Sequence, residues 1–212
     1  MNKKIVIGLI VVILLVGGFF LVRYLTKGSM GEGIGESLIN EEGKTGSTEL
    51  DSSKTLVIYF SQSGNTQKLA KLISDKVGGD FIRIETVKVY PTTYTVLAAE
   101  AKKERDKDER PALIELNLDL SKYDTIFVGY PIWWYTLPMP MYTFFDKYDF
   151  SGKTIVPFNT HEGSGNSGTY ETIKKFEPNV TVLEGLPIRG GDMTSNQSLK
   201  VNNWLKELGF IK

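Results

Sequence analysis

Small polar residues gather in the sequence SQSGNT at residues 61–66. They surround Gly64, which allows the backbone to turn tightly. The segment lies between a hydrophobic run typical of a strand and a pattern typical of a helix. The first amides of a helix lack intrahelical partners and attract anions, and the loop holds no lysine, so we expect a site for one phosphate monoester. A capped turn without a ligand is the alternative, because Ser, Asn and Thr are ordinary N-cap residues.

Two other segments resemble nucleotide-binding motifs. SGKT at residues 151–154 matches the end of a P-loop, but Lys147 stands where that motif requires glycine, and a strand rather than a helix follows. GSGNSG at residues 163–168 fits the G-x-G-x-x-G pattern of dinucleotide sites, with Glu184 about twenty residues further on. It follows the fourth expected strand rather than the first, so a dinucleotide site is the weaker interpretation.

Three adjacent aromatic residues, Trp133, Trp134 and Tyr135, lie in the proline-punctuated sequence GYPIWWYTLPMP at residues 129–140. Three neighbouring rings cannot all face one core. Either one tryptophan packs inward while another covers the surface, or the rings form a platform on which a flat ring system stacks. A further polar segment, NTHEGSGNSG at residues 159–168, either belongs to the same site or is a flexible glycine loop.

Hydrophobic runs and helical patterns alternate from residue 54 onward, which predicts an α/β fold. Strands are expected at residues 55–60, 81–85, 125–130, 154–160 and 180–185. Helices are expected near residues 69–77, 138–148, 169–176 and 195–208, and a helix with an extended arm between residues 89 and 120. Short apolar strands interleaved with helices imply a parallel sheet covered on both faces, with ligands beyond the carboxyl ends of its strands.

A mixed charge run at residues 98–110 falls within that helix and predicts a solvated helix face, with a docking surface as the alternative. The whole chain of 212 residues has a formal net charge of zero, so no basic excess indicates a nucleic-acid partner. It contains one histidine and no cysteine, which argues against a zinc site, a thiol nucleophile or a disulfide framework. Redox chemistry would therefore need a bound cofactor.

An uncharged apolar run at residues 5–22 precedes the globular part and is nearly long enough to span a bilayer. We expect residues 1–25 to form a membrane anchor, with a cleaved signal peptide as the alternative. Lys3 and Lys4 precede the run, which weakly favours a cytoplasmic amino terminus and an extracytoplasmic domain. Residues 26–53 are rich in Gly, Ser, Thr and Glu and predict a flexible linker to the domain at residues 54–212.

Residues 54–212 resemble the flavodoxin family. SQSGNT is similar to that family's phosphate loop for flavin mononucleotide (FMN), and GYPIWW at residues 129–134 and THEGSG at residues 160–165 resemble the two ring-holding loops of one bacterial subgroup. The resemblance implies a three-layer sandwich with a five-stranded parallel sheet of order 2-1-3-4-5, and noncovalent FMN. The residues implied in FMN binding are Ser61, Gln62, Ser63, Gly64, Asn65, Thr66, Pro131, Ile132, Trp133, Trp134, Tyr135, Thr160, His161, Glu162, Gly163, Ser164 and Gly165.

The resemblance favours an FMN protein that carries electrons at the membrane surface, between a donor and an acceptor, protein or quinone, that the sequence does not identify. One alternative is an NAD(P)H- or quinone-linked oxidoreductase, with Trp134, Tyr135 and His161 around a substrate space. Another is a tethered flavin binder or sensor. The family match places Glu162 near the pyrimidine edge of the flavin, where its charge would lower the reduction potential.

Overall fold

The computed structural model describes residues 50–212. The predicted membrane anchor, and the predicted linker up to residue 49, lie outside the described residues. Within residues 50–212, no helix has the length and apolar character needed to cross a lipid bilayer. The folded unit begins before the predicted boundary at Lys54, because Leu50 packs against the hydrophobic core and Ser52–Lys54 forms a short 3-10 helix, η1.

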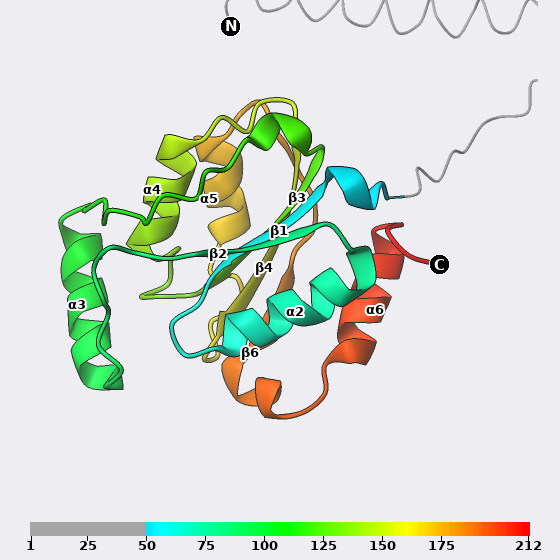
Figure 1. Ribbon diagram of the computed structural model, residues 1–212. Coiled ribbons are helices and arrows are strands. Elements are labelled where there is room, and N and C mark those ends of the chain that lie inside the picture. The colour runs from blue at the N-terminus through cyan, green and yellow to red at the C-terminus, as the bar shows by residue number, and fades with distance from the viewer. Residues whose placement is uncertain (1–49) are drawn as a thin grey trace, which may run out of the picture. The chain divides into compact units, whose positions relative to one another are not determined.

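A parallel sheet forms the centre of the domain (Figure 1). Its strands are β1 (Thr55–Phe60), β2 (Asp80–Ile84), β3 (Thr125–Pro131), β4 (Thr154–His161), β5 (Thr181–Val182) and β6 (Leu186–Arg189). The order is β2-β1-β3-β4-β5, and β6 also pairs with β4. The predicted order 2-1-3-4-5 is therefore confirmed. Because the strands are parallel, the segments that follow β1, β3 and β4 emerge at one edge of the sheet.

The fifth position of the sheet holds two short strands rather than the single predicted strand at residues 180–185. Ile155 of β4 pairs with Val182 of β5, and Phe158 of β4 pairs with Leu186 of β6. Residues 183–185 of the outermost strand position therefore lie opposite only residues 156 and 157 of β4, as in a β-bulge. One of those two is Pro157, which has no amide to donate to a neighbouring strand. The extra residue and the missing donor together account for the interruption.

Helices cover both faces of the sheet, as Figure 1 shows. They are α2 (Asn65–Val77), α3 (Tyr94–Asp106), α4 (Met139–Lys147), α5 (Thr169–Phe176) and α6 (Ser198–Glu207), with 3-10 turns η2 (Leu120–Lys122) and η3 (Gly190–Thr194). Alternate residues of β1 enter two cores: Ile58 packs with α4 and α5, whereas Val57 packs with α2 and α6. This alternation follows from the two-residue period of a strand. The helix α6 begins at Ser198, three residues after the predicted start, because η3 occupies the preceding segment.

The connection between β2 and β3 contains α3 and an extended arm, as predicted. The arm lies beside the segment that follows β2, where Ile114 N donates to Glu85 O (2.8 Å) and Val87 N donates to Ala112 O (2.9 Å). The prediction of a solvated face for the charge run is wrong at Glu104, which is 1% exposed. Its carboxylate accepts hydrogen bonds from Lys88 Nζ and Tyr90 OH, both at 2.7 Å, and these partners make its burial possible.

Candidate cofactor site

Thr160, near the end of β4, connects the three segments that the sequence assigns to one site. Its hydroxyl lies 2.8 Å from the hydroxyl of Thr66 at the start of α2, and both side chains are buried. Its carbonyl accepts from Ile132 N (2.7 Å), the first residue after β3. The segments after β1, β3 and β4 are therefore joined at one point on the carboxyl edge of the sheet.

The amino end of α2 offers an unpaired set of hydrogen-bond donors. The first helical bond runs from Lys68 N to Gly64 O, so the amides of Asn65 and Thr66 precede the helical ladder and have no acceptor among residues 50–212. The N-cap Gly64 has a φ of 89° and provides no side-chain cap. The hydroxyl of Ser61 caps one donor of this turn, the amide of Gln67, whereas the amides of Asn65 and Thr66 stay free and fit a phosphate monoester. Ser61 Oγ accepts from Gln67 N at 3.3 Å.

The side chains of Arg83 and Gln62 fix the backbone of residues 61–66. Arg83 on β2 donates from Nη2 to Ser61 O (3.0 Å). The side-chain amide of Gln62 donates from Nε2 to Tyr90 O and Pro91 O, both at 3.2 Å. This predicted cofactor residue therefore connects residues 61–66 to the chain that follows β2. Ser63 is exposed between these ties and the helix. Sequence reasoning missed Arg83, because nothing in a strand pattern tells which outward side chain will reach a neighbouring loop.

The three adjacent aromatic residues point to three different environments. Trp133 packs edge-on against Phe60 and Tyr90, with centroid distances of 5.4 and 5.2 Å. Trp134 is 39% exposed and Tyr135 is 74% exposed. Pro131 pairs with Thr160 at the end of the strands, so the aromatic segment starts directly at the sheet edge. Tyr135 therefore presents the most accessible ring of the three.

Trp134 and Tyr135 form a strained turn that α3 holds in place. Their φ angles are 49° and 63°, and Trp133 and Thr136 close the turn with two 3.1 Å backbone bonds, a pattern typical of type I′ turns. Left-handed backbone costs a residue with a Cβ about 1–2 kcal/mol. The indole of Trp134 donates to Ala98 O (2.7 Å), and the guanidinium of Arg105 lies 5.4 Å from the ring centroid. Strain retained at such a position is typical of a functional site.

Buried polar groups fix the shape of the loop after β4, residues 162–168. Asn159, fully buried in β4, donates from Nδ2 to Gly165 O (3.1 Å) and accepts from Tyr170 OH (2.7 Å). Thr169 Oγ1 donates to Asn166 O (2.6 Å), so its 2.9 Å bond with Tyr130 OH has the tyrosine as donor. These supports lie behind the predicted loop residues and were not identified from the sequence. Ser164 O accepts a bond from Ser167 Oγ (3.3 Å).

His161 is half-buried at the end of β4. Its Nδ1 accepts from Gly163 N at 2.9 Å, so the neutral imidazole carries its proton on Nε2. Burial lowers the pKa of His161 below its usual value, Arg189 lowers it further, and Glu162 and Asp192 oppose the change. His161 is therefore a neutral hydrogen-bond donor beside the loop at pH 7.

Glu162 points toward the segment after β6. Its carboxylate lies 4.0 Å from Arg189 Nε, and both side chains are largely exposed. A Cβ placed on Gly190 would lie 2.3 Å from Glu162 Oε1 and 2.9 Å from Asn65 Nδ2. The segment after β6 therefore lies close to Glu162 and to the start of α2. Sequence reasoning missed this fourth segment because the interruption of the edge strand concealed β6.

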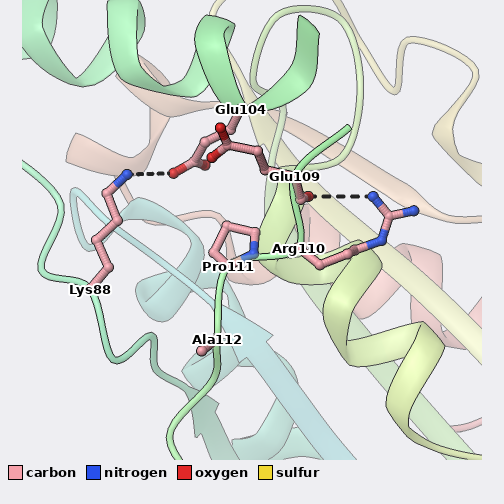
Figure 2. A pocket seen from close by; sticks show the side chains of 6 residues that line it. All are labelled: Lys88, Glu104, Glu109, Arg110, Pro111 and Ala112. Carbon is pink, nitrogen blue, oxygen red and sulfur yellow. Dashed lines mark hydrogen bonds and ion pairs between the residues drawn. The ribbon is translucent and has the colours of Figure 1, made fainter. Parts of the chain in front are cut away.

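A separate pocket of about 370 Å³ lies between α3 and the arm (Figure 2). It is lined by Lys88, Glu104, Glu109, Arg110, Pro111 and Ala112. Lys88 is paired with Glu104, and Arg110 donates to Glu109 O and to Asp108, so the cations that line the pocket are already used within the chain. The segments that Thr160 joins meet at the carboxyl edge of the sheet and not at this pocket, so we assign the candidate cofactor site to the sheet edge.

Comparisons with known proteins find a matching family and several solved structures with a similar fold. The sequence model of the family described as flavodoxin matches residues 54–208. A candidate flavoprotein from Bacteroides uniformis ATCC 8492 is 33% identical, with a TM-score of 0.65 over 74% of this chain and 99% of its own. One from Bacteroides eggerthii DSM 20697 is 30% identical, with a TM-score of 0.65 over 76% and 99%. A flavoprotein from Lactobacillus acidophilus NCFM, solved in complex with FMN, has the same fold at 21% identity, with a TM-score of 0.57 over 72% and 98%.

Proposed function

Because the chain belongs to the flavodoxin family and its cofactor is FMN, we propose that it carries electrons through FMN bound at the carboxyl edge of the sheet. The observation that carries this proposal is the unpaired donor set at the start of α2, joined through Thr160 to both neighbouring segments. A phosphate monoester is the group that such a donor set fits.

The phosphate would be held by the amides of Asn65 and Thr66 and by the hydroxyls of Ser61, Ser63 and Thr66. The buried hydroxyls of Ser61 and Thr66 are already oriented by Gln67 N and Thr160, so little ordering remains to be done on binding. Gln62 and Gly64 maintain the backbone of this segment. The role that we propose for Gln62 is to hold the loop rather than to contact the phosphate.

The flavin ring would lie between the segments after β3 and β4. Pro131 and Ile132 set the start of the first segment, and Tyr135 offers an exposed ring face for stacking. His161 offers the Nε2 proton, and Gly163, Ser164 and Gly165 keep the second segment small enough for close approach. FMN supplies one- and two-electron chemistry when bound, and the protein tunes it by stacking, hydrogen bonding and charge.

The apolar run at residues 5–22 supports a position at the cell membrane, and we propose that this carrier acts at the membrane surface, with the domain outside the cytoplasm. The partners are a redox donor and an acceptor of unidentified kind. Steady NAD(P)H oxidation by the purified chain in the presence of a quinone would instead favour an oxidoreductase. A bound flavin that cannot be reversibly reduced would favour a sensor.

The test compares FMN with riboflavin, which lacks the phosphate. We expect the full chain to quench FMN fluorescence at lower protein concentration than riboflavin fluorescence. The double variant Ser61→Ala, Thr66→Ala should weaken FMN binding by about 3 kcal/mol and riboflavin binding much less, because charge-assisted hydrogen bonds to phosphate are lost.

The control removes two hydroxyls at the opposite edge of the sheet. Ser53 and Ser121 each donate a hydrogen bond to a nearby aspartate in a 3-10 turn, at 2.6 and 2.7 Å. The variant Ser53→Ala, Ser121→Ala should leave both affinities unchanged. Equal affinity of the unmodified chain for the two flavins would reject the assignment of residues 61–66 to phosphate.

A further inference from the structure

The phosphate segment lacks a basic residue of its own, although its proposed ligand is close to doubly charged. Residues 61–66 contain neither lysine nor arginine. A phosphate monoester carries about −1.5 to −2 charges at pH 7. Amides and hydroxyls can bind such an ion, but they do not neutralise it.

Arg83 brings a permanent positive charge to this segment from the neighbouring strand β2. Its Nη2 donates to Ser61 O at 3.0 Å, and its Nε lies 3.6 Å from Glu85 Oε1. Arginine stays charged at all physiological pH values, and its guanidinium has five N–H donors in a fixed plane. The contact with Ser61 O therefore uses only one of the N–H donors of Arg83.

The contact also acts on the peptide that begins the segment. The carbonyl of Ser61 belongs to the same peptide group as the amide of Gln62. A cation bound to that carbonyl polarises the peptide and makes its N–H a stronger donor. Arg83 thus favours an anion in two ways, through its charge and through the peptide that it contacts.

We propose that Arg83 is the cation of the phosphate segment and sets the preference of this site for a phosphorylated over an unphosphorylated flavin. Arg83 acts through Ser61 and is therefore a positioning residue. The inference rests on the proposed function, since it assumes that a flavin phosphate occupies the start of α2.

Two other cations lie near the start of α2 and define the competing explanations. Arg189 faces Glu162 at 4.0 Å, so its charge is partly compensated. Lys68 follows in the first turn of α2 and is exposed to solvent, and no hydrogen bond joins its side chain to residues 61–66. Among residues 50–212, only Arg83 has a charged side chain that forms a hydrogen bond with residues 61–66.

The experiment measures dissociation constants of the full chain for FMN and for riboflavin and compares their ratio among variants. Arg83→Gln should reduce the preference for FMN about fivefold, the size expected for a partly exposed charge beside a doubly charged group, with riboflavin affinity within about twofold of the unmodified chain. Arg83→Lys should keep most of the preference, because it keeps the charge. Glu85→Gln should increase it slightly by removing the competing carboxylate.

A matched control removes a cation at the opposite edge of the sheet. Lys54 pairs with Asp124 at 3.2 Å and is 55% exposed, as Arg83 pairs with Glu85 and is 42% exposed. Lys54→Gln should leave the ratio unchanged, and Lys68→Gln should change it less than about twofold. Raising the salt concentration should reduce the preference of the unmodified chain more than that of Arg83→Gln.

Three results would overturn the inference. Equal weakening of FMN and riboflavin by Arg83→Gln would mean that Arg83 only holds the loop. An unchanged ratio in Arg83→Gln, or a larger loss in Lys68→Gln, would assign the charge to another residue. An unmodified chain that binds neither flavin would reject the proposed function, and this inference with it. Circular dichroism of Arg83→Gln and Arg83→Lys checks that both variants are folded.

Discussion

At the scale of single residues, Glu162 is the acidic residue of the predicted cofactor site. The family match predicts a position near the pyrimidine edge, where its carboxylate would oppose reduction. In the structure Arg189 lies 4.0 Å from this carboxylate, and the two side chains are 65% and 62% exposed. Solvent and Arg189 both weaken the field of Glu162, so its effect on a reduction potential must be smaller than that of an isolated charge.

We therefore predict opposite effects of two neutral variants. Glu162→Gln should raise the reduction potential of bound FMN and Arg189→Gln should lower it, each on the order of 30 mV, because one removes a negative and the other a positive charge. The double variant should return toward the original value. A spectroelectrochemical titration measures the potentials, and the affinity for oxidised FMN should barely change. Shifts below about 15 mV would leave both residues with a structural role only.

His161 predicts a specific pH dependence of stability. Its pKa is lowered in the folded chain, chiefly by burial, with Arg189 acting in the same direction and Glu162 and Asp192 opposing. When the pH falls below the unfolded pKa of about 6.5, the unfolded chain takes up a proton before the folded one, so the free energy of unfolding decreases. The loss continues until the folded imidazole is also protonated. At higher pH both forms are neutral, and this contribution to stability is fully present.

The variant His161→Gln removes this titration and retains an acceptor for Gly163 N. Its free energy of unfolding should therefore fall less than that of the unmodified chain between about pH 7.5 and about pH 5.5. The chain has one histidine, so an NMR titration of the imidazole reports His161 without ambiguity. A folded-state pKa at or above that of a free histidine would contradict the prediction.

Among the elements, β3, β4 and α5 support the loop at residues 162–168 through two hydrogen-bonded chains. One runs from Tyr170 through Asn159 to Gly165 O, and the other from Tyr130 through Thr169 to Asn166 O. In the first chain, Tyr170 OH is the only donor to Asn159 Oδ1 among the described residues. In the second chain, Thr169 can still donate to Asn166 if Tyr130 OH is removed. The two chains therefore differ in how well they tolerate loss of a hydroxyl.

This difference predicts unequal effects of two similar substitutions. Tyr170→Phe leaves the buried Asn159 Oδ1 unpaired and should lower the free energy of unfolding by about 1–3 kcal/mol. Tyr130→Phe removes a donor whose acceptor keeps its other bond, and should cost about 0.5–1.5 kcal/mol. Chemical denaturation measures both values. Similar losses, or a larger loss in Tyr130→Phe, would show that the Asn159 chain is not the main support of the loop.

Most strands and helices could be predicted from the sequence, because short continuous apolar runs such as residues 55–60 alternate with helical patterns. The order of the sheet could be predicted only from the resemblance to the flavodoxin family. The loops after β1, β3 and β4 could be grouped because parallel strands share an edge. The division of the fifth strand could not be predicted, since it depends on the register of Val182 and Leu186 against β4. The roles of Arg83 and Asn159 could not be predicted for a similar reason, because they depend on contacts between distant segments and not on sequence spacing.

At the scale of the described domain, the parallel sheet separates its first residues from the candidate cofactor site. Leu50 and η1 lead into β1 at the amino edge, whereas residues 61–66, 131–136 and 161–168 follow strands at the carboxyl edge. A strand of six residues spans about 20 Å. Residue 50 and the candidate site therefore lie at opposite ends of the strands.

The proposed topology places that domain outside the cytoplasm, and protease accessibility tests it. The motivation is the position of Lys3 and Lys4 before the apolar run, together with a domain that needs no reduced cysteine. Protease added to intact cells should release a soluble fragment by cutting within residues 26–49, because this segment is rich in Gly and Ser, while Leu50 and η1 are packed into the domain. The fragment should therefore retain Leu50 and still bind FMN. Complete protection until the cells are lysed would reverse the orientation and place the redox partners in the cytoplasm, whereas release without protease would indicate a cleaved signal peptide in place of an anchor.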